Sequence, residues 1–271
     1  MEFSFLILLL IGLAAGVLAG LFGIGGGVLF TPILFLLFKE AGMSQLVLWT
    51  IGTSLFCTFI AAAGSSIRQY RQDNFFGNEG LRVGLLGAAG VWAGKQVATA
   101  AFYTEQVFAI FFSLLFLYVA YRFVKRGRNS AREARAPRRL ITLKEAGITG
   151  GAGGFVAALA GIGGGSVMVP IMNLYYRIPI QKAVSVSSLA IVFISLSGWL
   201  QLAFYPAGGS SLSGYALGVV DLGAALPLSI GGLTGGFLGA FINLKVNRQY
   251  LQYGFALLAL IIVVKLLSDV F

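Results

Sequence analysis

The chain has 271 residues and a net charge of +10, and 58% of its residues are hydrophobic while only 10% are charged. Its mean hydropathy of +0.90, with several apolar runs of about twenty residues, exceeds what a water-soluble domain of this length needs for its core. The single cysteine and the lack of histidine exclude a disulfide framework, a thiolate metal centre and a serine–histidine triad. We therefore expect a polytopic membrane protein that is not an enzyme and uses no cofactor.

The first apolar stretch, residues 3–38, is interrupted by the motif GIGGG at residues 23–27. About 20 residues cross a bilayer at 1.5 Å per residue, so this stretch is too long for one span and too short for two full ones. No basic segment precedes it and no cleavage pattern follows it, so we expect it to stay in the protein rather than act as a removable signal peptide. Three further spans are expected at residues 44–67, 78–99 and 106–121.

A polar linker follows at residues 122–145, and its nine Lys and Arg residues prevent it from crossing a bilayer. The second half then repeats the order of the first. An apolar stretch at residues 146–176 is interrupted by a second GIGGG, and spans are expected at residues 183–203, 216–242 and 250–267.

Short motifs recur in the same order in both halves, at offsets of 134 to 141 residues. They are the GIGGG motif, a proline five residues after its last glycine, a hydroxyl patch and a pair of glycines. The matched positions are Gly23 and Gly161, Pro32 and Pro170, Thr53 and Ser187, and Gly90 and Gly231. We infer two homologous transmembrane repeats, residues 1–121 and 146–271, joined by the basic linker.

Positive charge decides whether each interrupted stretch crosses the bilayer once or folds back as a hairpin. Cytoplasmic loops are rich in Lys and Arg, so the linker is placed in the cytoplasm. Hairpins put sixteen of the nineteen cations on that side, whereas single crossings put thirteen there. We therefore expect an all-α fold of two inverted-topology repeats, each a Gly-broken helical hairpin plus three transmembrane helices, with both termini in the periplasm.

A helix break at membrane depth leaves backbone groups unpaired, which is tolerated only around a protein-enclosed, wettable cavity. The helix that restarts after each break directs its first N–H groups and its positive dipole end at that cavity, and such termini bind anions. Neutral hydroxyls can donate there without burying another charge. The residues expected to bind the anion are Gly23, Ile24, Gly25, Gly26, Gly27, Thr53, Ser54, Gly161, Ile162, Gly163, Gly164, Gly165, Ser166, Ser187 and Ser188.

Close helix packing is the alternative explanation for glycine in a membrane helix. We favour it for the scattered glycine stripes, which are also compatible with a homodimer. Their members are Gly12, Gly16 and Gly20, and Gly231, Gly235 and Gly239. For the duplicated five-residue clusters we favour the cavity. A nucleotide loop is not indicated, because GIGGG lacks the last glycine of a dinucleotide fingerprint.

Four further residues are candidates for gating or for attracting the anion: Arg68, Lys95, Trp199 and Gln201. Arg68 either attracts anions at the inner mouth or simply follows the positive-inside rule, and Lys95 is either an interface anchor or a substrate ligand. Trp199 either belongs to an aromatic belt or lines the pathway. Asp221 could carry a coupling proton, although solvation at the interface is the simpler interpretation. The linker cations are expected to face water and lipid headgroups rather than nucleic acid.

Two GxGGG breaks with a following proline, each succeeded by an [ST]-S-L hydroxyl patch and separated by a basic linker, resemble the TauE/SafE sulfite exporter family, also labelled YfcA-like. The resemblance covers essentially the whole chain. It implies a permease of the bacterial inner membrane that exports sulfite or organosulfonates such as sulfoacetate, with the matching motif residues at its site. The second half departs from this pattern by having Ser187 instead of threonine and by lacking a counterpart of Arg68.

We therefore expect a secondary transporter that exports a small sulfur oxyanion by alternating access, with the anion and the lipid bilayer as its partners. The alternatives are a channel or permease for another small anion and a membrane scaffold that transports nothing.

Overall fold

A computed structural model describes residues 5–22, 27–71, 74–126, 139–207, 211–243 and 248–270. These ranges are almost entirely helical. The helices are α1 (Phe5–Phe22), α2 (Gly27–Glu40), α3 (Leu46–Arg71), α4 (Gly77–Ala98), α5 (Glu105–Arg126), α7 (Leu143–Ala160), α8 (Gly165–Pro170), the π-helix η1 (Ile171–Tyr175), α9 (Ile180–Ala203), α10 (Leu222–Asn243) and α11 (Arg248–Val270). Five of them, α3, α5, α9, α10 and α11, are long and apolar enough to cross a membrane. The expected all-α polytopic fold is thereby confirmed.

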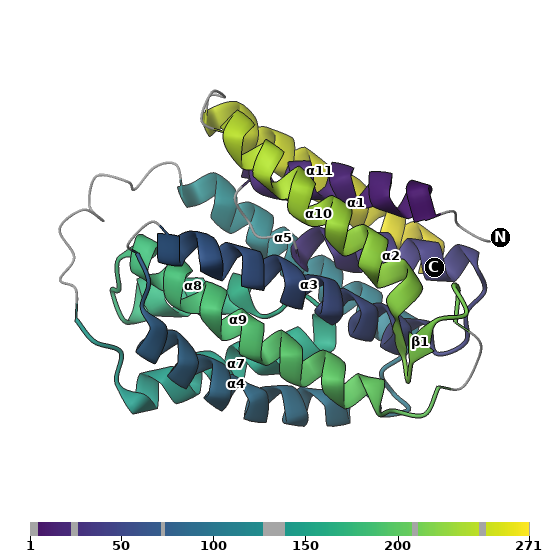
Figure 1. Ribbon diagram of the computed structural model, residues 1–271, viewed down its shortest axis with the longest axis horizontal. Helices are drawn as coiled ribbons and strands as arrows, with labels where there is room; N and C mark the ends of the chain where they lie inside the picture. Colours follow the sequence, from purple (N-terminus) through teal and green to yellow (C-terminus); the bar gives the residue numbers. More distant parts are fainter. Residues whose placement is uncertain are drawn as a thin grey trace.

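Each interrupted apolar stretch forms a helical hairpin. The second one consists of α7 followed by α8 and η1, and its two ends meet, because the Arg139 side chain just before α7 donates to the Tyr176 carbonyl just after η1 at 3.0 and 3.2 Å. The first consists of α1 and α2, and Figure 1 shows the start of α1 at the same end of the molecule as the end of α2. At that end Lys39 forms an ion pair with Glu105 at 3.7 Å and donates to the Asp269 carbonyl.

The most extensive helix contacts join elements from opposite halves of the chain. Helix α1 packs along α10, and α4 packs along α7 (Figure 1). Glycines make this approach possible, because a Cβ on Gly16 would overlap the backbone of Gly232, and one on Gly154 would overlap the backbone of Gly87. Membrane helices use small residues in this way to bring their backbones together.

The packing explanation for the scattered glycine stripes is confirmed at several positions. A Cβ on Gly12 would overlap the backbone of Leu228, and one on Gly231, Gly235 or Gly239 would overlap backbone atoms of α1. These positions of the two stripes are therefore covered by packing inside the chain.

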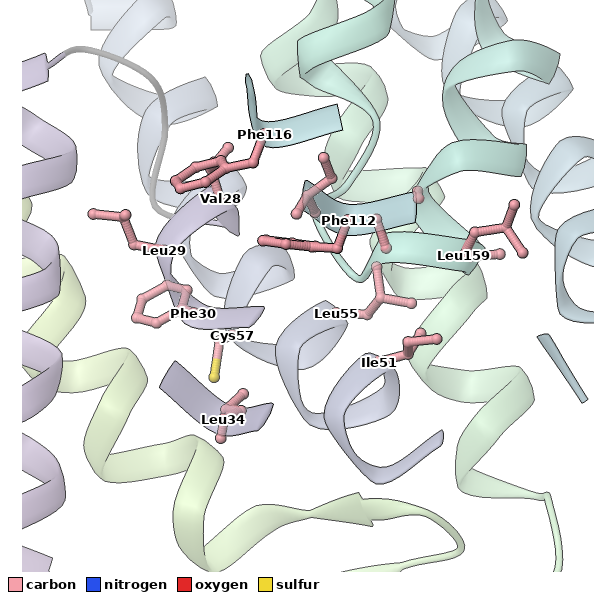
Figure 2. Packing of buried hydrophobic residues seen from close by; sticks show 14 of the residues in the cluster. Val28, Leu29, Phe30, Leu34, Ile51, Leu55, Cys57, Phe112, Phe116 and Leu159 are labelled. Atoms are coloured by element: carbon pink, nitrogen blue, oxygen red, sulfur yellow. The ribbon is translucent and has the colours of Figure 1, made fainter. Parts of the chain in front are cut away.

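The centre of the molecule holds α3 and α9, which pack against each other, while α5 packs against α11. A single cluster of buried apolar side chains connects these elements. Figure 2 shows part of it, with labelled side chains from α2, α3, α5 and α7. Stacked rings extend the cluster along α5, where Phe108 lies 5.3 Å from Phe35 and 5.9 Å from Phe112 between ring centroids.

Candidate functional site

The second helix break requires glycine at several positions. Gly161 ends α7 with φ +73°, and Gly163 and Gly164 have φ +70° and +77°, a left-handed conformation that other residues adopt at a cost. A Cβ on Gly164 would also overlap the backbone of Gly153 on α7. The break thus combines a sharp reversal of the chain with close contact to the preceding helix. In the first break, residues 23–26 lie outside the described ranges, and Gly27 is the first residue of α2.

Gly27, at the start of α2, and Gly163, in the second break, both lie against the same side chain on α3, that of Thr58. A Cβ placed on Gly163 would lie 2.6 Å from the Thr58 methyl and 3.2 Å from the Ser195 hydroxyl. A Cβ placed on Gly27 would lie 2.9 Å from the same methyl and 2.5 Å from the Thr58 hydroxyl. We call these four residues, Gly27, Thr58, Gly163 and Ser195, the break junction. It joins the two hairpins to α3 and α9.

The two hydroxyls of the break junction have no hydrogen-bond partner among the described residues. Thr58 is 3% exposed and Ser195 is fully buried. Leaving a buried polar group unpaired costs about 1–3 kcal/mol, so each such group calls for an explanation. The Ser166 hydroxyl, at the start of α8, is likewise buried and without a described partner. The junction therefore presents hydrogen-bond donors that the protein itself does not use.

Among the hydroxyls singled out from the sequence, Ser166 has no described partner, whereas those of Thr53, Ser54, Ser187 and Ser188 are already engaged. Ser54 donates to the Gly161 carbonyl at 2.9 Å and shares a 2.8 Å hydrogen bond with Thr31. Ser54 thus attaches the end of α7 to α3 and α2, and Thr53 accepts a hydrogen bond from the opposite half. In α9, Ser187 and Ser188 both donate to the Val184 carbonyl one turn earlier.

Thr58 and Ser195 were not predicted from the sequence, because they lie outside the short hydroxyl motifs that recur in the two repeats. Thr58 follows Ser54 by four residues, and Ser195 follows Ser188 by seven. Those spacings keep each pair on one face of its helix. Extending each hydroxyl patch along its own helical face would have found both residues.

None of the four gating candidates belongs to the break junction, although Trp199 lies one turn after Ser195 on α9. Arg68 is exposed near the end of α3, and the Lys95 ammonium lies 5.8 Å from the centre of the Tyr205 ring, one turn before the end of α4. Trp199 packs against Phe56 and Phe59, with ring centroids 5.3 and 6.3 Å away. Gln201 donates to the Ser197 hydroxyl at 2.9 Å.

A buried ion pair ties several elements together at the end of the molecule where the linker attaches. The Lys182 ammonium lies 2.9 Å from the Glu79 carboxylate, and the two side chains are 4% and 7% exposed. Glu79 also accepts a 2.8 Å hydrogen bond from the Ile141 N–H, and Lys182 donates to the Arg139 carbonyl at 2.8 Å. This linker-end cluster joins the starts of α4 and α9 to the residues just before α7.

A two-stranded hairpin lies at the opposite end of the molecule (Figure 1). Strands β1 (Ala216–Leu217) and β2 (Val220–Asp221) pair antiparallel, with Ala216 opposite Asp221. We call residues 216–221 the hairpin plug. Val219 and Val220 are fully buried, and the Val219 N–H donates to the Leu202 carbonyl at 3.2 Å.

Asp221 anchors the hairpin plug to both neighbouring helices. Its N–H donates to the Thr53 hydroxyl at 3.1 Å, and its carboxylate accepts from the Ala224 N–H at 2.9 Å in the first turn of α10. The same carboxylate accepts from the backbone and the hydroxyl of Ser213. The expected span at 216–242 therefore begins too early. The helix starts at Leu222, and Asp221 is the buried residue that caps it rather than a side chain solvated at the interface.

A helical bundle with two broken hairpins and buried, unused donors at their junction has the features of a membrane transporter site. The family model described as "Sulfite exporter TauE/SafE" matches residues 8–266, and the chain belongs to this family.

Curated relatives of similar length carry transporter names. A probable membrane transporter protein of Methanocaldococcus jannaschii is 30% identical over 93% of this chain and 92% of its own length. One of Haemophilus influenzae is 28% identical over 97% and 98%, and YunE of Bacillus subtilis, also named a probable membrane transporter, is 28% identical over 91% of each chain. No solved structure matches the chain.

Proposed function

We propose that this protein is a secondary transporter that exports a small sulfur oxyanion, sulfite or an organosulfonate, by alternating access. The observation that carries the proposal is the break junction, where two buried hydroxyls have no described partner: Thr58 lies against Gly27 and Gly163, and Ser195 lies against Gly163. A small oxyanion accepts several hydrogen bonds in a confined space and so matches such a set of donors. The family's description supplies sulfite as the first substrate to test.

The packing of the helices supports an inverted repeat. Under the repeat correspondence, α1 matches α7 and α4 matches α10, so the contact of α1 with α10 and that of α7 with α4 are equivalent. Each broken hairpin thus packs on the other half, as expected for two repeats related by a pseudo-two-fold axis. We place the linker in the cytoplasm because of its cations, with the hairpin plug and both termini on the outer side of the inner membrane.

We propose that two closures separate the break junction from the two sides of the membrane. The linker-end cluster closes the cytoplasmic side through Glu79 and Lys182, and the hairpin plug closes the outer side through Val219 and Val220. Alternating access requires each closure to open while the other stays shut. We therefore assign the ion pair as the inner gate and the hairpin plug as the outer gate.

Export of an anion needs no obligatory coupling ion. An inside-negative membrane potential drives one negative charge outward with about 2.3 kcal/mol per 100 mV. The described helices contain no chain of acidic side chains across their middle that would serve as a proton relay. We propose a uniporter that uses the potential.

The test is uptake and counterflow of labelled sulfite in reconstituted vesicles, with sulfate, thiosulfate and organosulfonates as competitors. A carrier saturates and shows counterflow, whereas a channel shows neither. Ser195→Ala should abolish most of the flux. Ser113→Ala on α5 is the matched control, because its hydroxyl is also buried without a described partner but lies outside the break junction. Unchanged sulfite flux in folded Ser195→Ala would remove the break junction from the pathway, and no sulfite flux in the native protein would refute the substrate.

A further inference from the structure

We infer that the transported species is singly charged: bisulfite rather than the sulfite dianion, and monoanionic sulfonates rather than sulfonates that carry a second charge such as sulfoacetate. This inference rests on the proposed function and narrows its substrate class. The observation behind it is the distribution of charge along the whole chain.

No charged side chain belongs to the middle of any predicted span. The uncharged stretches are residues 3–38, 46–67, 83–94, 106–121, 146–176, 183–220, 222–244 and 249–264. Along α3, ten residues separate Thr58 from Arg68, which corresponds to about 15 Å of helix. Along α9, thirteen residues separate Ser195 from Lys182, or about 20 Å. An anion at the break junction therefore meets no cationic side chain from either helix.

The charged groups at the two ends do not supply the missing countercharge. At the linker end, the Lys182 ammonium is already neutralised by Glu79. At the other end, the acid Asp221 contacts α3, because its N–H donates to the Thr53 hydroxyl, five residues before Thr58. Its carboxylate repels a second negative charge. The titratable neighbour on α3 itself, Cys57, directs its thiol to the Ala225 carbonyl.

The charge of the anion affects the cost of its desolvation more strongly than its attraction to the site. The cost of removing an ion from water rises with the square of its charge, whereas its attraction to neutral hydroxyl and amide dipoles rises only in proportion to the charge. Doubling the charge therefore multiplies the cost about fourfold and the gain about twofold. A site made of the Thr58 and Ser195 hydroxyls and the backbone at Gly163 therefore favours one charge over two. Arg and Lys, which supply a countercharge, are accordingly common partners of phosphate groups.

The experiment uses the native protein in vesicles with equal pH on both sides. At constant total sulfite, initial flux should fall in proportion to the bisulfite fraction as the pH rises through neutrality. Methanesulfonate, which keeps a single charge over this range, serves as the control and should show constant flux. Methanesulfonate should also compete with sulfite, whereas sulfate and sulfoacetate should compete at least tenfold less well.

The charge moved per turnover gives a second measurement. For one charge, a tenfold sulfite gradient should be balanced by about 59 mV, and for two charges by about 30 mV. A balance near 30 mV, or sulfite flux that follows the dianion, would overturn the inference while leaving sulfite export intact. If neither sulfite nor methanesulfonate is transported, the proposed function itself fails.

Discussion

Replacing Thr58 by valine should change stability and transport in opposite directions. The Thr58 hydroxyl is buried and has no described partner, so the empty protein bears the cost of an unpaired polar group. Valine has nearly the same shape and removes that group. We therefore expect Thr58→Val to stabilise the protein by about 1 kcal/mol, at the lower end of the cost of a buried unpaired group.

The same change should weaken binding of the anion. A hydrogen bond to a charged group contributes about 1.5–3 kcal/mol, which corresponds to a loss of affinity of roughly ten- to a hundredfold. Thermal unfolding in detergent measures the first effect, and the concentration of sulfite at half-maximal flux in vesicles measures the second. Most substitutions in a membrane protein core lower stability and substrate affinity together. A gain in stability with a loss of affinity is therefore diagnostic.

Thr50→Val is the matched control for this experiment. Thr50 lies on the same helix and is fully buried, but its hydroxyl donates to the Leu46 carbonyl at 2.8 Å. Its replacement should leave sulfite affinity unchanged and should not stabilise the protein. If Thr58→Val lowers stability, or leaves sulfite affinity within twofold of the native value, the assignment of Thr58 as an unused donor for the anion is wrong.

Three other substitutions test the packing and the gates. Gly231→Ala should abolish the folded species seen by size-exclusion chromatography because its Cβ overlaps α1 backbone, whereas Gly236→Ala on the same helix has room and should be neutral or stabilising. Lys182→Met leaves a buried carboxylate unpaired and should cost about 3–5 kcal/mol in unfolding assays, whereas Lys265→Met removes only an exposed ion pair and should cost less than about 1 kcal/mol. Gly163→Ala forces a left-handed φ of +70° on alanine and should cost about 1–3 kcal/mol, with sulfite flux reduced; native stability and flux would contradict the required glycine.

Composition and hydrophobic run lengths were enough to predict the helices, because a bilayer demands apolar spans of a narrow range of lengths. The expected spans 44–67 and 183–203 compare with α3 at Leu46–Arg71 and α9 at Ile180–Ala203. The hairpin plug was not foreseen. Residues 216–221 are apolar enough to continue a span, and only their pairing and the cap formed by Asp221 show where α10 begins.

The candidate site was predictable in part. The glycine clusters located the breaks because only a protein-enclosed site tolerates them at membrane depth. Sequence could not reveal which hydroxyls are unused, because that depends on partners far along the chain. Ser54 is engaged by Gly161, 107 residues away, whereas Thr58, one turn further along the same helix, has no described partner.

Because helices of one half pack on helices of the other, the order of synthesis affects how the protein folds. Helix α1 is synthesised first, yet its glycine face fits the backbone of α10, and 216 residues separate Gly16 from its neighbour Gly232. At about 5–20 residues per second, the ribosome needs roughly ten to forty seconds to supply that partner. During this interval α1 rests in lipid or in the insertion machinery with its contact face unfilled. Packing of α1 on α10 therefore waits for the second half of the chain, and a chain interrupted before α10 lacks the main partner of its first helix.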